Sequence, residues 1–197
     1  MTQTDRERSF IAQLTAETGT LGFFSELHDV VPLDPNPAFS WVGVQVSRLG
    51  HMLGYLAEPR SVTPLRLYFR YTEHGYKLFV RSARCYRSTL GFKDGFIGAF
   101  STQENEHREL FSIQWLGGTP ELPVQPDSRL TCHLIARSTG KPLSVRTRRL
   151  QLNVGGRRHP AQYETFTGIS ADGASPLSLH LQILQIHAPY LDNPDEV

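Results

Sequence analysis

The stretch that decides the fold spans residues 65–82 and reads L-R-L-Y-F-R-Y-T-E-H-G-Y-K-L-F-V-R-S. In its first half, apolar residues alternate with charged or polar ones, and this period of two predicts a half-buried β-strand. Gly75 can adopt a positive φ angle at a turn, and after it Leu78 and Val80 again lie two positions apart. The stretch therefore predicts a β-hairpin.

A second stretch, residues 130–147, aligns with the first without a gap at an offset of 65. It reads L-T-C-H-L-I-A-R-S-T-G-K-P-L-S-V-R-T, so that Gly140 matches Gly75. Further apolar segments follow each hairpin, and the two units extend over residues 65–115 and 130–169. We interpret them as an internal repeat with about four strands in each unit.

The remainder of residues 39–188 also reads as short strands between Gly- and Pro-rich turns, and the clearest alternation runs over residues 177–183. Roughly ten to twelve short strands predict one all-β domain, folded as a barrel, a sandwich or a trefoil. Residues 4–17 place apolar side chains on one helical face, at Phe10, Ile11 and Leu14. We therefore expect an N-terminal helix and a Pro-rich arm over residues 1–38, and an acidic tail over residues 189–197.

Two segments of the second unit resemble a lobe of the β-trefoil superfamily. They read G-K-P-L-S-V at 140–145 and Y-E-T-F at 163–166, and the likeness is nearest to the fascin and actin-crosslinking group, over about residues 63–170. The resemblance implies a β-trefoil-like barrel, and a β-sandwich is the alternative. Ricin-type lectins resemble the chain more loosely, because Gln114 and Trp115 are adjacent here and do not form a Gln-x-Trp spacing. That second likeness implies a sugar held by an aromatic side chain and a carboxylate or amide.

Composition limits the class of protein. The chain has 197 residues, of which 39% are hydrophobic and 20% charged, as expected for one domain with its own core. No apolar run reaches the roughly 18 residues of a transmembrane helix. The polar residues 1–8 lack the pattern of a Sec-type signal. We therefore expect a protein that stays in the cytoplasm or is exported by a signal-independent route.

Charge is segregated along the chain. Residues 128–163 carry a net charge of +8 without an acidic side chain, whereas residues 1–40 and residues 172–197 each carry −4. Acidic ends that lie over the basic stretch would explain this distribution. The alternative is a fascin-like protein-interaction module in which residues 137–158 meet an acidic partner, through Arg146, Arg148, Arg149, Arg157 and Arg158. RNA or another polyanion is a possible partner that we do not favour.

The sequence contains none of the common catalytic motifs. We find no nucleophile elbow, P-loop, dinucleotide fingerprint or zinc-protease motif, and the eight histidines lack metal-ligand spacing. We therefore predict no catalytic residue, no metal and no cofactor, and an enzyme is the less expected class. Glu109 is expected to be a solvated loop carboxylate, and Cys85, close to Arg84 and Arg87, is a candidate for a lowered thiol pKa.

The function that we expect is non-enzymatic recognition of carbohydrate, in the manner of a lectin. The predicted ligand contacts are Trp115, Tyr86 and Asp94, because aromatic rings stack on sugars and a carboxylate accepts hydrogen bonds from hydroxyl groups. A place for Trp115 in the core is the competing interpretation.

Overall fold

The computed structural model describes residues 5–27, 49–103, 107–118, 126–152, 162–172 and 175–188. In these residues the secondary structure is almost entirely β, with one short helix. The elements, in chain order, are β1 (Phe10–Ala16), β2 (Thr20–Phe23), α1 (Phe24–Leu27), β3 (Leu53–Leu56), β4 (Leu65–Thr72), β5 (Gly75–Val80), β6 (Thr89–Lys93), β7 (Phe96–Phe100), β8 (Phe111–Leu116), β9 (Arg129–Ala136), β10 (Lys141–Pro142), β11 (Ser144–Leu152), β12 (Gln162–Ser170) and β13 (Leu179–Ile186).

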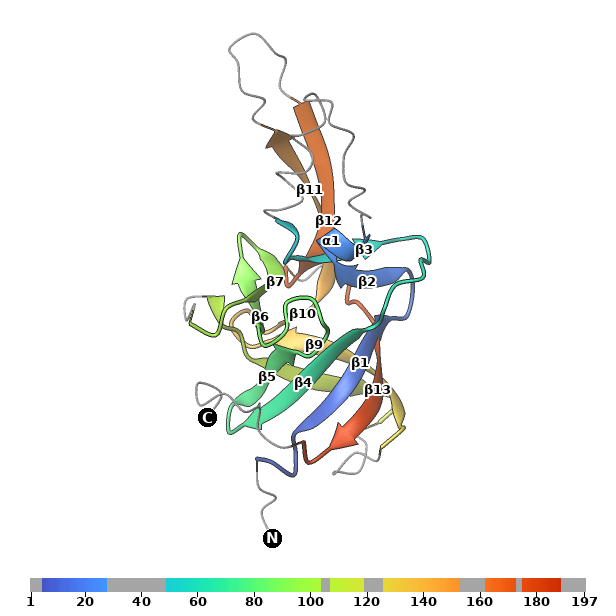
Figure 1. Ribbon diagram of the computed structural model, residues 1–197, viewed down its shortest axis with the longest axis vertical. Helices are drawn as coiled ribbons and strands as arrows, with labels where there is room; N and C mark the ends of the chain where they lie inside the picture. Colours follow the sequence, from blue (N-terminus) through green and yellow to red (C-terminus); the bar gives the residue numbers. More distant parts are fainter. Residues whose placement is uncertain are drawn as a thin grey trace.

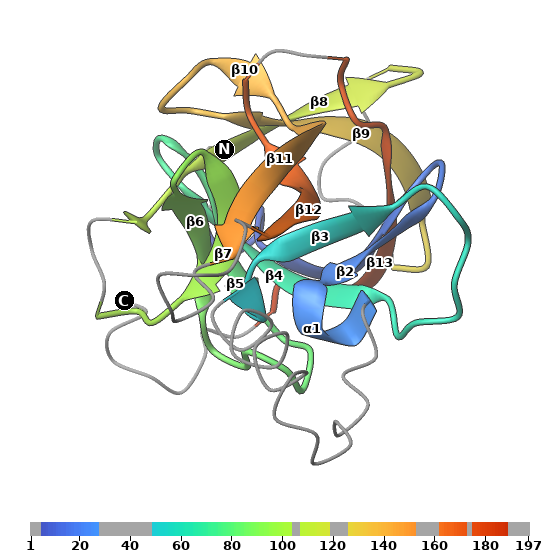
Figure 2. The same ribbon diagram turned by 90° about the horizontal axis from the view of Figure 1, so that it is seen from above.

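Six of these strands close into an antiparallel barrel. Around the barrel the order is β1, β4, β5, β8, β9 and β13, and β13 pairs again with β1. Figures 1 and 2 show the closed wall from the side and from above. The contact between β5 and β8 is the shortest of the six, since the pairing recorded there joins Tyr76 to Phe111.

The barrel interior is filled by alternate side chains of its strands. The buried positions include Phe10, Ala12 and Leu14 of β1, Leu65, Leu67 and Phe69 of β4, and Leu179, Leu181 and Ile183 of β13. Across β1 and β4, the rings of Phe10 and Phe69 stack with centroids 4.7 Å apart. The alternation predicted at 65–70 and at 177–183 is thus confirmed, and so is an all-β barrel.

Three pairs of antiparallel strands lie between successive barrel strands in the chain. β2 pairs with β3, β6 with β7, and β11 with β12. β12 also pairs with β3, where Gly168 faces Gly54, so that β11, β12, β3 and β2 form a second, four-stranded sheet. In Figure 1 this sheet lies above the barrel, and the β11–β12 hairpin rises away from it.

The prediction of an N-terminal helix is wrong. Residues 10–16 form β1, which pairs with β13 on one side and with β4 on the other. The helical interpretation grouped Ile11 with Phe10 and Leu14, whereas the fully buried side chains are at 10, 12 and 14. Alanine at position 12 hides the period of two, and pairing on both edges outweighs the local preference for a helix.

The two stretches aligned at an offset of 65 fold alike only in part. Each forms an antiparallel hairpin with a glycine of positive φ in the turn, β4–β5 in the first and β9–β10 in the second. β5 then stays in the barrel, whereas β11 leaves it for the second sheet. The turns also differ, because φ is 138° at Gly75 and 67° at Gly140. The aligned stretches therefore do not occupy equivalent places in the fold.

Some expectations concern residues outside the described ranges. These are the proline-containing part of the N-terminal arm, within residues 28–48, and the acidic tail at 189–197. No helix in the described ranges is both long and apolar enough to cross a membrane.

We predict that Gly75→Ala destabilises the protein more than Gly140→Ala. A Cβ atom at Gly75 would lie 2.8 Å from the carbonyl oxygen of Phe111, whereas one at Gly140 would meet no atom within 4 Å. Gly140→Ala should lower the free energy of unfolding by about 1 kcal/mol, the cost of a left-handed alanine. Gly75→Ala should lower it by about 2 kcal/mol or more, because a steric clash adds to backbone strain. Urea unfolding followed by circular dichroism measures both, and equal losses would contradict the difference between the turns.

Candidate functional site

A pocket lies where β8 runs past the turn of the β4–β5 hairpin. Its volume is about 460 Å³, within the range of small-molecule sites. We call it the Trp115 pocket. The residues that line it are Arg8, Tyr71, Glu73, His74, Gly75, Tyr76, Ser112, Ile113, Gln114, Trp115 and Arg137.

Aromatic rings form one part of the Trp115 pocket. Trp115 is half-buried against the barrel core and pairs with Cys132 of β9. The rings of Tyr71 and Tyr76 meet edge to face at 5.3 Å, and burial raises the pKa of Tyr76 to about 12. The Tyr76 phenol therefore stays neutral at physiological pH. Trp115, one of the predicted contacts, lines a pocket and also packs on the core.

Charged side chains form the other part. The guanidinium carbon of Arg8 lies 3.5 Å from the centroid of the Tyr71 ring. Its Nε atom is buried and has no hydrogen-bond partner among the described residues. Glu73 and Arg137 add a carboxylate and a second guanidinium. The pocket thus brings two guanidinium groups, a carboxylate and aromatic rings together.

Glu109 holds the strand ends beside this pocket. Its carboxylate accepts hydrogen bonds from the backbone N–H groups of Leu110 and Ser138, both at 3.0 Å, and from the Ser138 hydroxyl group. The side chain is buried, so the expectation of a solvated carboxylate is wrong. These bonds fix the segment after β9, which carries Arg137, against the segment that leads into β8.

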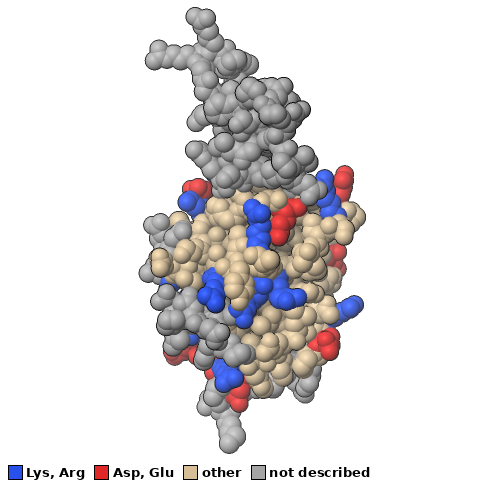
Figure 3. Space-filling view, in the orientation of Figure 1, with Lys and Arg blue, Asp and Glu red and all other residues tan. Residues whose placement is uncertain are grey.

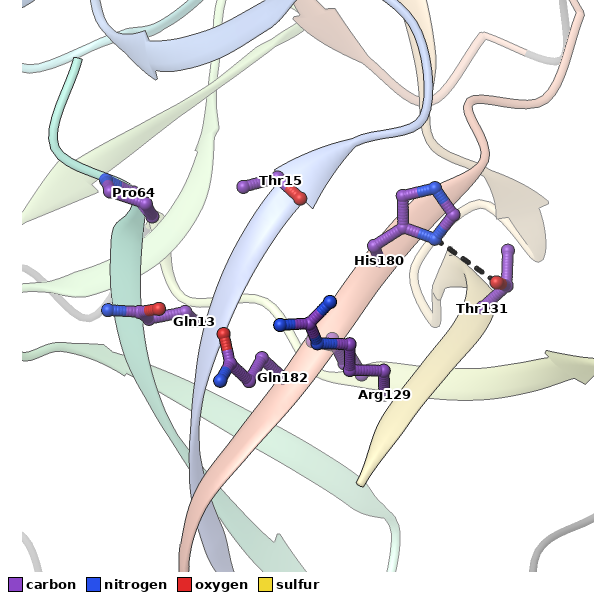
Figure 4. Close-up of a pocket in the computed structure, with 8 residues that line it drawn as sticks. Gln13, Thr15, Pro64, Arg129, Thr131, His180 and Gln182 are labelled. Carbon is purple, nitrogen blue, oxygen red and sulfur yellow. Dashed lines mark hydrogen bonds between the residues drawn. The ribbon is translucent and has the colours of Figure 1, made fainter. Parts of the chain in front are cut away.

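A second pocket lies on the outer wall of the barrel and spans β1, β13 and β9. Its volume is about 500 Å³, and we call it the outer-wall pocket. Figure 4 shows its polar side chains on three adjacent strands, with Pro64 beside them at the start of β4. The residues that line it are Gln13, Thr15, Pro64, Arg129, Thr131, His180, Leu181 and Gln182.

Strand register arranges the polar side chains of the outer-wall pocket in two rows. One row crosses the strands as Gln13, Gln182 and Arg129. The other crosses them as Thr15, His180 and Thr131. Within the second row, Thr131 Oγ1 and His180 Nδ1 are 3.1 Å apart, which fixes the imidazole ring. Both rows stand on a sheet, and such elements hold side chains more rigidly than loops do.

Tyr86, the second predicted contact, lies in the β5–β6 loop and is 49% exposed. The guanidinium groups of Arg81 and Arg87 both lie 5.5 Å from its ring centroid. Arg81 also donates a 3.0 Å hydrogen bond to the phenol oxygen. That bond, together with the charges of the two arginines, lowers the pKa of Tyr86.

Cys85 precedes this tyrosine, and its φ angle is 55°. Burial raises the pKa of its thiol, against the opposing effect of Arg84. The expectation of a lowered thiol pKa is therefore wrong.

Asp94, the third predicted contact, sits in the turn between β6 and β7 with a φ angle of 53°. Neither Asp94 nor Tyr86 lines the pocket that contains Trp115. Of the three predicted contacts, Trp115 therefore lines the Trp115 pocket without the other two.

The basic patch lies partly on β11. Arg146 is 3.6 Å from the carboxylate of Asp172 and 5.7 Å from the ring centroid of Phe96. Arg148 and Arg149 are exposed on the same strand, and Arg157 and Arg158 fall outside the described residues. The ion pair at Arg146 shows that a C-terminal acidic residue compensates part of the basic stretch. Figure 3 shows further Lys and Arg side chains gathered across the middle of the visible face.

Comparison with protein families, with curated proteins and with solved structures found no significant match to this chain.

We predict that Tyr86 ionises at lower pH than an ordinary tyrosine. In a titration of near-ultraviolet tyrosinate absorbance, Tyr86→Phe should remove the component that appears at the lowest pH. Arg81→Gln should move this component to higher pH, because it removes both the hydrogen bond and a positive charge. An unchanged onset in Tyr86→Phe would show that the arginines do not stabilise the phenolate.

Proposed function

We propose that this chain is a non-enzymatic recognition module that binds carbohydrate in the Trp115 pocket, as a lectin does. The observation that carries the proposal is the combination of aromatic and hydrogen-bonding groups around one space of about 460 Å³. A carbohydrate uses both kinds of group, since each sugar ring has C–H faces and a rim of hydroxyl groups.

The chemistry of the pocket matches this requirement. An aromatic face packs on sugar C–H groups, and Trp115 and the tyrosines supply such faces. A hydroxyl group both donates and accepts hydrogen bonds, so it can donate to Glu73 and accept from Arg8 or Arg137.

We also infer that the barrel is a β-trefoil. The strand order supports three successive units, β1–β4, β5–β8 and β9–β13, each with two barrel strands that flank an antiparallel strand pair. The unit boundaries differ from those suggested by the sequence alignment, because residues 65–82 join the last strand of one unit to the first strand of the next. A measured structure in which these units superpose by a threefold rotation would support the inference.

We test carbohydrate binding with a glycan array and three variants. The wild-type protein should bind at least one glycan, and Trp115→Ala and Gln114→Ala should weaken that binding by about tenfold or more. Gln114 is exposed, so its variant removes a contact without opening the core. Tyr86→Ala is the matched control, since it removes an exposed aromatic ring outside the pocket, and it should bind as the wild type does. No glycan bound at high protein density, or equal binding by all variants, would overturn the proposal.

A second candidate function is association with an acidic protein partner, in a fascin-like manner. It is favoured by the β11–β12 hairpin, which projects from the barrel in Figure 1 and carries exposed Arg148 and Arg149. Such an association should weaken at high salt and in the Arg148→Glu, Arg149→Glu double variant. A pull-down with the same yield for wild type and double variant would argue against it.

A further inference from the structure

We propose that the outer-wall pocket binds a small ligand through a tetrahedral oxyanion, as found in a phosphate or sulfate ester. This site is distinct from the Trp115 pocket, because the two share no lining residue. The inference therefore stands independently of carbohydrate binding.

The charge of the outer-wall pocket suits an anion. Arg129 contributes a guanidinium group, and no Asp or Glu is among the described residues that line the space. Figure 4 shows the Arg129 side chain reaching from β9 over β13, so that its guanidinium group lies between Gln182 and His180. An oxyanion in the pocket would meet positive charge without an opposing carboxylate.

The number of donors indicates a tetrahedral group. A guanidinium fork can satisfy two oxygens of an oxyanion. The amide groups of Gln13 and Gln182, which are neighbours across β1 and β13, each provide two further N–H donors. A carboxylate has two oxygens and would leave many of these donors unused, whereas phosphate and sulfate have three or four. Donor groups on three strands therefore fit the tetrahedral anion better.

The spacing of the strands limits the size of the ligand. Neighbouring strands lie about 4.8 Å apart, so the row Gln13, Gln182 and Arg129 spans roughly 10 Å. The second row adds Thr15 and Thr131, whose hydroxyl groups can bond with the remainder of the ligand. A small ester with polar groups beside its anion would match both rows.

We test this site by isothermal titration with inorganic phosphate, sulfate and acetate at moderate ionic strength. Phosphate or sulfate should bind the wild-type protein, and acetate should bind at least about tenfold more weakly. Arg129→Gln should weaken binding of the tetrahedral anion by about tenfold or more, because it removes a charge-assisted contact. Gln182→Ala should weaken it to a smaller extent.

Arg66→Gln is the matched control, since it removes an exposed guanidinium group on the same face but outside the lining residues. It should keep the wild-type affinity for phosphate within about twofold. If Arg66→Gln and Arg129→Gln lost the same affinity for phosphate, the anion would be attracted by the overall positive charge of this face. That result would overturn the proposed site. Absence of phosphate and sulfate binding, or equally tight acetate binding, would also overturn it.

Two cross-tests separate this site from the proposed function. Gln114→Ala should bind phosphate normally, and Arg129→Gln should bind glycans normally. Loss of both ligands in either variant would contradict two separate sites. Sugar phosphates and sulfated sugars, titrated in parallel, distinguish the two kinds of ester by their relative affinities.

Discussion

The architecture depends on the contact by which β8 meets the β4–β5 hairpin. Alternating apolar strands can form an open sheet as readily as a barrel, and the pairing of Tyr76 with Phe111 supplies the link between β5 and β8 that closes the wall. That link requires the backbone of Gly75 to approach the Phe111 carbonyl group more closely than a Cβ atom would allow. Because Trp115 follows on β8, the same approach creates the pocket beside it.

Much of the fold could be predicted from periodicity, and the exceptions have physical causes. β4 and β13 alternate large apolar residues with polar ones, so their inward faces are evident in the sequence. β1 has a small residue, Ala12, at the middle of its inward face. The alternation of large apolar residues is therefore weak in this segment, and the helical spacing of Phe10, Ile11 and Leu14 is easier to see in the sequence. The residue matches between 65–82 and 130–147 reflect two hairpins of similar pattern, but β5 is a barrel strand, whereas the short β10 is followed at once by β11 of the second sheet.

The candidate sites were less predictable, because they depend on which strands become neighbours. The sequence predicts Trp115 as a ligand contact because aromatic rings stack on sugars. Arg8, Tyr71 and Arg137 come from distant segments, and only the barrel brings them next to it. Glu109 looked like a solvated carboxylate because its hydrogen-bond partner Ser138 is far away in the sequence. In the sequence, nothing distinguishes Gln13 and Gln182 from other polar residues on outward faces. They become neighbours only through the register of β1 and β13.

Within the described residues, each barrel strand pairs with a neighbour on both sides, whereas the second sheet ends at β11 and at β2. An exposed strand edge is a template on which another molecule can add a strand, and positive charges along it oppose that addition. Arg146, Arg148 and Arg149 lie along this strand. Because charged side chains on an edge strand oppose such addition, we expect that replacing these arginines with neutral residues would leave the edge more prone to aggregation in concentrated solution.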